Sequence, residues 1–163
     1  MEKLRDATLL FLIKKSEGRI TDICLAMKKH GFGAGRWNGT GGKVEPGESI
    51  ESAVIREAME ELGVVAAGPW KIAEFSFYFP HNPAWDQKVH VYFSETWEGD
   101  PVETEEMRPR WFKVSEIPFK EMWPGDIFWI PEVVEGRLVR GMFKFGEGDV
   151  VLDKEVKIVS DFA

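Results

Sequence analysis

Short runs of apolar residues, most of them rich in β-forming side chains, recur along the chain and predict its strands. Residues 7–14 form a nearly continuous run, typical of a strand buried on both faces, and residues 20–27 return after a turn. Further strands are predicted at 70–79, 88–97, 111–114, 138–145 and 150–159, with a loop at 80–87. The pattern therefore predicts a fold built mainly around a β-sheet.

One segment, residues 49–62, has the spacing of an amphipathic helix instead. Ser49 can cap its start, and Gly63 stands where a helix C-terminal glycine is expected. The apolar stripe of this helix consists of Ile50, Val54, Ala58 and Leu62. A second, shorter helix is predicted within 126–135, where Pro131 requires that it begin or break near that residue.

The order of these elements, mostly strands with two helices, indicates the α+β class and an α/β/α sandwich around a mixed sheet. No repeat or linker-like segment divides the 163 residues, so a single domain over 1–163 is expected. Residues 31–42 contain six glycines, which predicts a loop whose backbone adopts unusual dihedral angles or approaches another group closely.

Composition narrows the possible partners and compartments. The 21 Lys and Arg residues against 28 Asp and Glu give a net charge of −7, which argues against a nucleic-acid polymer or an anionic membrane as partner. The one cysteine, Cys24, lies in an apolar strand and is expected in the core, which fits a reducing compartment. With no signal-peptide pattern and no apolar run of membrane-spanning length, we expect a cytoplasmic protein.

Three carboxylates of the predicted helix carry the first chemical signal. Glu57, Glu60 and Glu61 are spaced i, i+3 and i+4, which predicts that they share one helix face and repel each other. We expect the neighbouring Arg56 to project elsewhere and not to neutralise all three. A divalent cation bound through oxygen ligands, Mg²⁺ or Mn²⁺, would balance the charge. The alternative is an acidic helix face that is only solvated.

Seven positions within residues 42–64 match the spacing of the Nudix box, G-x5-E-x7-R-E-U-x-E-E-x-G-U, where U is a bulky aliphatic residue. These positions are Gly42, Glu48, Arg56, Glu57, Glu60, Glu61 and Gly63. Ala58 stands at the first U position, where it predicts a smaller packing contact. The chain thus resembles the Nudix family, whose members hydrolyse a nucleoside diphosphate linked to another moiety with Mg²⁺ or Mn²⁺.

The resemblance implies roles for the box residues. The implied metal ligands are Glu57, Glu60, Glu61, Glu106 and the carbonyl of Gly42. Arg56 would orient a box carboxylate, and Glu48 would brace the loop before the helix or hold a metal ligand in place. The general base differs among members of the family, and Glu61 and Glu106 both remain possible here.

Residues 27–39, 105–109, 117–124 and 143–145 resemble more narrowly the monomeric branch of the family that cleaves oxidised purine nucleoside triphosphates, such as 8-oxo-dGTP and 2-oxo-dATP, to monophosphate and pyrophosphate. This implies a small nucleotide substrate and a purine pocket. Its residues would be Asn38 at the base, Trp123 stacked on it, Thr8 and Phe32 as lining, and Lys28 near the sugar or phosphates. Asn38 is alternatively a turn residue before a glycine, and Trp123 alternatively a core aromatic.

The pocket departs from this branch at one point. Gly125 and Asp126 occupy positions at which the branch has two adjacent aspartates, and that pair is thought to exchange a proton and so accommodate two oxidised bases. With Asp126 alone, a narrower or shifted base preference is expected. Asp126 is alternatively an N-cap of the second helix.

Two other functions of the protein stay open. One is hydrolysis of a normal or methylated nucleotide, and the other is nucleotide binding without cleavage, although binding modules usually lack some box carboxylates.

Overall fold

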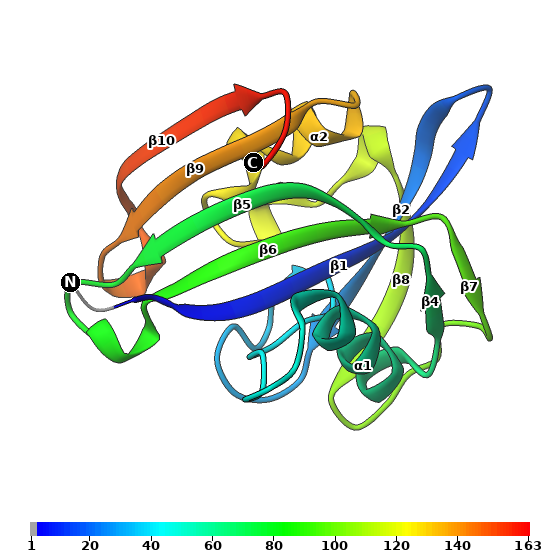
Figure 1. Cartoon of the computed structure of the whole chain (residues 1–163), viewed down its shortest axis with the longest axis horizontal. Helices are drawn as coiled ribbons and strands as arrows, with labels where there is room; N and C mark the ends of the chain where they lie inside the picture. Colours follow the sequence, from blue (N-terminus) through cyan, green and yellow to red (C-terminus); the bar gives the residue numbers. More distant parts are fainter. Residues whose placement is uncertain (1–2) are drawn as a thin grey trace.

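A mixed β-sheet is the centre of the computed structural model, which describes residues 3–163 (Figure 1). Over these residues the sheet has eight strands in the order β10-β9-β5-β6-β1-β2-β3, with β8 also paired to β2. The strands are β1 (Arg5–Ser16), β2 (Arg19–Lys28), β3 (Trp37–Asn38), β5 (Trp70–Tyr78), β6 (Gln87–Ser94), β8 (Met107–Lys113), β9 (Leu138–Phe145) and β10 (Val151–Val159). Two pairs, β1 with β6 and β5 with β9, are parallel, and the others are antiparallel.

Helix α1 (Ile50–Leu62) covers one face of the sheet (Figure 1). It begins as predicted, because the side chain of Ser49 accepts a hydrogen bond from the backbone N–H of Ser52 at 3.1 Å. It ends at Gly63, which adopts φ of 73° in the left-handed region. Ala58, at the box position of a bulky aliphatic residue, is completely buried against the sheet.

The opposite face is covered by short helical turns instead of one long helix. The predicted second helix is divided into η4 (Asp126–Phe128) and α2 (Ile130–Val134), because Trp129 between them leaves helical geometry at φ of −133°. Two further turns, η2 (Val114–Glu116) and η3 (Phe119–Glu121), precede them. The predicted sandwich is therefore confirmed, with one long helix on one side and short turns on the other.

Strand β1 contributes to both apolar clusters of the protein, which explains its nearly continuous apolar run. Phe11 and Ile13 face the cluster beneath η4 and α2, whereas Leu10 and Leu12 face the cluster beneath α1. This is the alternation of a strand with both faces buried. Cys24 lies in the α1-side cluster as expected, and burial raises the pKa of its thiol to about 11.

Several boundaries differ from the prediction. The strand predicted at 88–97 ends at Ser94, whose hydroxyl donates to the carbonyl of Ala67 at 3.2 Å. The chain then forms β7 (Thr96–Glu98), which pairs with β4 (Val65–Ala67) in a separate small sheet. The loop at 80–87 contains a short turn, η1 (Pro83–Trp85). Among residues 3–163, no helix is long and apolar enough to cross a membrane.

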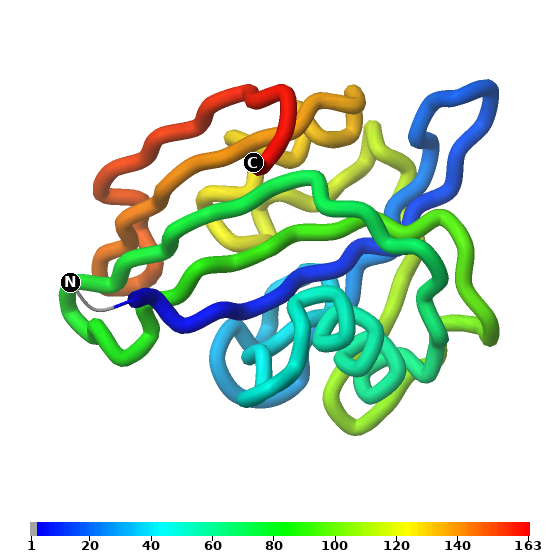
Figure 2. Tube along the Cα trace, viewed as in Figure 1, coloured from blue at the N-terminus to red at the C-terminus, as the bar shows by residue number. Residues whose placement is uncertain are grey.

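The glycine-rich segment 31–42 lies beneath β1 beside α1 (Figure 2). Both expected reasons for its composition are found. Gly33 and Gly35 have φ of 82° and 85°. Gly39 and Gly41 instead lie directly against β1, where a Cβ atom would overlap the carbonyl oxygens of Leu10 and Thr8. The segment can therefore approach β1 this closely only with glycine at these two positions.

We predict that Gly41→Ala destabilises the protein by roughly 3 kcal/mol, because the added methyl group must displace either β1 or the segment itself. Gly18→Ala is the control, since Gly18 has φ of 77° but no atom within 4 Å of its Cβ position. Its expected cost is backbone strain alone, about 1–2 kcal/mol. Chemical denaturation of both variants measures the difference, and equal losses would contradict the close-approach explanation.

Candidate active site

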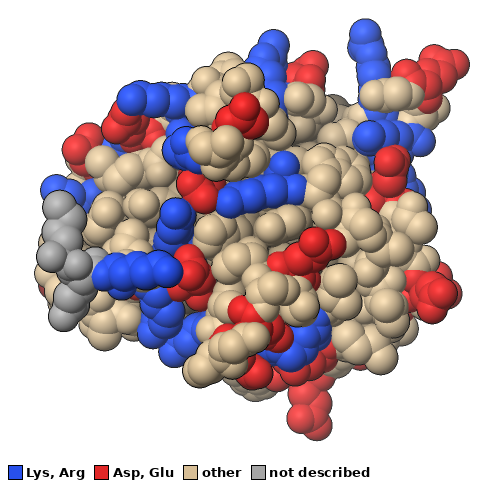
Figure 3. Space-filling model, in the orientation of Figure 1, with Lys and Arg blue, Asp and Glu red and all other residues tan. Residues whose placement is uncertain are grey.

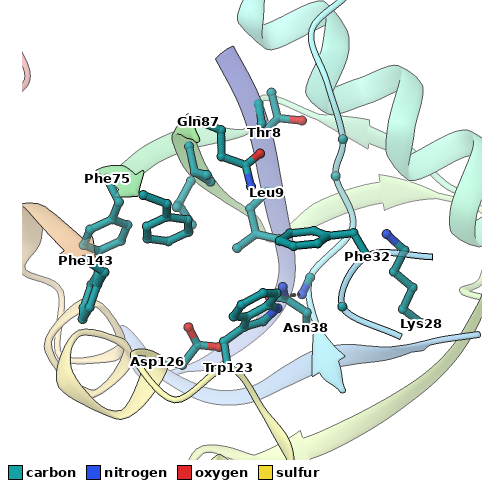
Figure 4. A pocket seen from close by; sticks show the side chains of 18 of the residues that line it. Thr8, Leu9, Lys28, Phe32, Asn38, Phe75, Gln87, Trp123, Asp126 and Phe143 are labelled. Atoms are coloured by element: carbon teal, nitrogen blue, oxygen red, sulfur yellow. Dashed lines mark hydrogen bonds between the residues drawn. The ribbon is translucent and has the colours of Figure 1, made fainter. Parts of the chain in front are cut away.

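A largely aromatic pocket opens on the sheet face beneath the short helical turns (Figure 4). Its empty volume is about 960 Å³, including the part open to solvent. Five phenylalanines form much of its wall. Phe75 and Phe77 belong to β5, Phe79 follows that strand, and Phe143 and Phe145 belong to β9. Sequence reasoning did not assign these residues to the pocket, although their alternation along β5 and β9 already placed them on one sheet face.

All six side chains predicted to bind the nucleotide line this one pocket. They are Thr8, Lys28, Phe32, Asn38, Trp123 and Asp126. They come from β1, β2, the glycine-rich segment, β3, the stretch after η3, and η4. The fold thus brings together residues that are distant in the sequence, and their individual roles stay predictions.

Two buried polar atoms in this pocket lack partners. Across residues 3–163, the buried side-chain atoms without a hydrogen bond are Oγ1 of Thr8 and Oδ2 of Asp126. Both residues line the pocket. A buried polar atom without a partner destabilises a protein, so these two atoms indicate a place where a ligand with polar groups would bind.

Asp126 is deeply buried, and its burial raises the pKa of its carboxyl group to about 7. A hydrogen bond from the indole N–H of Trp129 to Oδ1, at 3.3 Å, and the charge of Arg36 oppose this shift. The carboxyl group can therefore hold or lose its proton near neutral pH. The N-cap alternative is wrong, because no side chain caps η4.

The position before Asp126 has no room for a side chain. A Cβ atom on Gly125 would lie 2.9 Å from Cε1 and 3.0 Å from Cδ1 of Phe143. The ring of Phe143 is itself completely buried. Glycine instead of aspartate at position 125 therefore has a steric explanation, since the ring of Phe143 fills the space that a second carboxylate would need.

Aromatic side chains surround the mouth of the pocket. The ring centroids of Phe32 and Trp123 are 5.2 Å apart, and those of Phe32 and Trp85 are 5.1 Å apart. The loop at 80–87 thus forms part of the pocket rim. Arg36 lies 4.5 Å from the ring of Trp123 and pairs with Asp149 at 2.6 Å, which holds the indole in place.

Asn38 is a turn residue and also lines the pocket. Its Oδ1 accepts a hydrogen bond from the backbone N–H of Gly39 at 2.8 Å, as a turn asparagine does. Its side chain also lines the pocket, and within the described part of the chain no protein group binds its Nδ2. The amide nitrogen therefore remains available to a ligand, while its oxygen is fixed by the backbone.

The three box carboxylates differ in burial, although their spacing places them on one side of the helix. Glu61 is 3% exposed and Glu57 is mostly covered, but the side chain of Glu60 is 54% exposed. Because successive helical residues are about 100° apart, Glu60 and Glu61 lie on either side of Glu57, and Glu61 turns toward the sheet while Glu60 turns toward solvent. In Figure 3, acidic and basic side chains accordingly lie side by side over α1.

Arg56 does not project away from the acidic residues, so that expectation is wrong, although as expected it does not pair with all three box carboxylates. Its guanidinium donates to both oxygens of Glu48 at 2.7 and 2.9 Å, to Glu57 at 2.9 Å and to Glu60 at 3.2 Å. The hydrogen bond from Arg56 holds the pKa of Glu48 at about 2. Among the described contacts of Arg56 there is none to Glu61, so the most buried carboxylate keeps no basic partner on the helix.

Burial raises the pKa of Glu61 to about 8, and the charges of Glu57 and Glu106 add to this shift. Burial also raises the pKa of Glu57. Thr104 links Glu106 to Glu61. Its hydroxyl donates to the backbone carbonyl of Glu61 at 2.9 Å and accepts from the backbone N–H of Glu106 at 3.2 Å. Lys28 lowers the pKa of Glu61 and also lines the pocket, so it lies between the two sites.

The chemistry of these donors fits a divalent cation. They are all oxygens, and the pKa values of Glu57 and Glu61 are raised mainly by burial, with the charges of neighbouring carboxylates adding to the shift. A Cβ atom on Gly42 would lie 2.6 Å from Oε1 of Glu57, so the Glu57 carboxylate rests on this glycine. Over residues 3–163, however, no three Asp, Glu, His or Cys side chains converge into a ready-made cage. The complete ligand set stays a prediction.

An α+β sandwich with an acidic helix beside an aromatic pocket defines a recognisable class. The family model of the NUDIX domain matches residues 3–133, and the chain belongs to the Nudix family. It is 42% identical over 140 residues to the oxidized purine nucleoside triphosphate hydrolase of Mus musculus, covering 86% of this chain and 89% of that protein. The protein of the same name from Danio rerio is 42% identical over 139 residues, covering 85% and 88%.

Solved structures show the same fold. A MutT protein from Bacillus halodurans superposes with a TM-score of 0.80 and 24% identity, covering 94% of this chain and 98% of that one. Nudix hydrolases act on small nucleotide substrates and generally need a divalent metal. The acidic helix and the adjoining pocket are the parts of this chain that suit those two requirements.

We predict that Asp126→Asn gains stability relative to the wild type as pH rises. The carboxyl group has a pKa of 3.8 when unfolded and about 7 when folded, so between these values the native state binds the extra proton. The wild type therefore loses stability from about pH 4 to about pH 7, and the asparagine variant lacks this loss. Denaturation of both proteins across this range isolates the effect, and a constant difference would contradict the burial of an ionisable Asp126.

Proposed function

We propose that this protein hydrolyses oxidised purine nucleoside triphosphates of the 8-oxo-dGTP type to the monophosphate and pyrophosphate, using Mg²⁺. We propose further that it acts as a monomer on the nucleotide pool of the cytoplasm, with residues 1–163 as one domain. The observation that carries the substrate class is an aromatic pocket with two unpartnered buried polar atoms, adjoining a helix with excess negative charge.

The pocket would hold the base. Trp123 and Phe32 present flat faces at its mouth, and stacking of a base on an aromatic ring contributes about 1–3 kcal/mol. The Nδ2 of Asn38 would donate to an acceptor on the base, and Oδ2 of Asp126 would donate or accept according to its proton. Thr8 would satisfy its hydroxyl on the same ligand. These groups favour a planar, polar-edged ligand such as a purine.

Lys28 would direct the phosphates from the pocket toward α1. Its charge acts on Glu61 while its side chain lines the pocket, so a nucleotide seated in the pocket would extend past it toward the carboxylates. A triphosphate and a helix with excess negative charge repel each other, so neither can approach the other without a cation between them. Lys28 supplies one positive charge at this junction and leaves the remainder to a metal ion.

Glu57, Glu61 and the carbonyl of Gly42 are the best placed residues to hold that metal, with Glu60 and Glu106 as further ligands. When bound, a divalent cation neutralises phosphate charge and lowers the pKa of a coordinated water. Arg56, fixed by Glu48, orients the carboxylate of Glu57.

The general base would be Glu61 or Glu106. The N–H of Gly41 holds Glu61 at 2.7 Å, which fixes the direction of one of its oxygens. Thr104 fixes the backbone of Glu106 against the end of α1. A backbone group thus orients the side chain of Glu61, whereas for Glu106 the backbone is fixed near the end of the helix. A function limited to nucleotide binding fits less well, because every box carboxylate is retained.

We expect the base preference to be narrower than that of an enzyme with paired aspartates, because Phe143 occupies the space beside Asp126. Pyrophosphate release from 8-oxo-dGTP, 2-oxo-dATP, dGTP and a methylated dGTP at fixed Mg²⁺ measures this. The proposal expects the highest kcat/KM for one oxidised purine. Equal use of both oxidised bases would contradict the narrowed preference, and faster hydrolysis of an unmodified or methylated nucleotide would contradict the substrate class.

We predict that Glu57→Gln and Glu61→Gln each lower turnover by roughly two orders of magnitude or more, as loss of a metal-ion contribution would. Neither change should reduce the melting temperature without metal, since burial disfavours the ionised carboxylate at both positions. Glu51→Gln is the matched control, because Glu51 is exposed on the same helix. Mg²⁺ should raise the melting temperature of the wild type and the control but not of Glu57→Gln. A large metal-free loss of stability would indicate a structural role for these carboxylates.

A further inference from the structure

The first residue of β6 breaks an apolar pattern. Gln87, Val89, Val91 and Phe93 alternate along the strand and so point to one face of the sheet. Val91 is completely buried there and Val89 is 6% exposed, within the apolar cluster beneath the short helical turns. Gln87, the only glutamine of the chain, therefore occupies a position at which the pattern predicts an apolar side chain.

The strand register places Gln87 at the pocket. It is opposite Phe77 on β5, and both residues line the pocket. Figure 4 shows the amide of Gln87 extending past Leu9 into the pocket, from the side away from Asn38 and Asp126. The side chain is half-buried, and among residues 3–163 no hydrogen bond joins its amide to another protein group. A primary amide thus stands in an apolar wall with its donors and its acceptor unused.

We propose that Gln87 is a specificity-determining residue that hydrogen-bonds to the edge of the bound purine. This inference rests on the proposed function, because it assumes that the pocket holds the base. Asn38 and Asp126 reach one side of the pocket from β3 and η4, whereas Gln87 reaches it from β6. A base between them would be bound along two edges, and the amide can both donate and accept.

An amide in this place favours one base over another more than an apolar side chain could. A site with buried hydrogen-bonding groups rejects a base that leaves them unpaired, while an apolar wall accepts bases of similar shape. Oxidation of a purine changes which edge atoms donate and which accept. Gln87 therefore adds selectivity in a pocket where Gly125 leaves Asp126 without a second carboxylate.

The test is Gln87→Met, which keeps the length of the side chain and removes its hydrogen bonds. For the nucleotide that the wild type prefers, KM should rise about three- to tenfold, as expected for one lost hydrogen bond, with kcat changed less than about twofold. For the unmodified nucleotide, KM should change less, so the preference for the oxidised base shrinks. Lys88→Met is the control, because Lys88 is the next residue of β6 and points to the other face.

The melting temperature separates this role from packing. Methionine suits an apolar wall, so Gln87→Met should be at least as stable as the wild type. Unchanged kinetics in the variant, or an equal loss for every base, would overturn the inference while leaving the proposed hydrolysis intact.

Calorimetric titration with 8-oxo-dGMP keeps the two proposals distinguishable. If the wild type hydrolyses no nucleotide of the panel, the proposed function fails, but weaker binding of 8-oxo-dGMP by Gln87→Met would still support the role of Gln87. If the wild type binds no purine monophosphate, the inference is overturned as well.

Discussion

The contact between β1 and residues 39–42 is the constraint on which the site depends. Without side chains, Gly39 and Gly41 let this segment lie against the carbonyls of β1, where Thr8 donates its N–H to the carbonyl of Gly42 at 2.9 Å. The same segment carries Asn38 into the pocket, and its Gly41 N–H binds Glu61 at 2.7 Å. One stretch of backbone thus sets the pocket and the acidic helix relative to each other.

Around this contact, charge is distributed unevenly along α1. Arg56 pairs with Glu57 and Glu60, whereas the buried Glu61 has a backbone N–H as its hydrogen-bond donor. Partial neutralisation would stabilise the helix before any cation is bound, because like charges at helical spacing repel. It also leaves negative charge in excess at one place, beside Gly42 and Lys28, which is where a cation and a phosphate chain would be most favourable.

The sequence pattern predicted those features of the structure that depend on interactions between residues close together in the chain. The cap at Ser49, the end at Gly63 and the two-sided burial of β1 each follow from neighbouring residues. Sequence spacing could not predict that Arg56 folds back onto Glu57, since helical wheels place side chains but not their flexible ends. Nor could it predict that Phe143 fills the space beside Gly125, because this depends on how the turn before η4 packs against β9, or that Gln87 enters the pocket, because this depends on the register between β5 and β6.

Two buried carboxyl groups, Asp126 in the pocket and Glu61 on the helix, have pKa values raised to about 7 and about 8. Each opposes folding when it is ionised, so neither is explained by stability of the protein alone. Their surroundings differ in a way that suits different ligands. Asp126 is enclosed by aromatic rings, where a neutral base with polar edges can satisfy it, whereas Glu61 lies among other carboxylates, where only positive charge can. A nucleotide bound with a cation offers both partners in one ligand, which requires the pocket and the acidic helix to adjoin, and the segment 39–42 joins them because it lines the pocket and binds Glu61 through the N–H of Gly41.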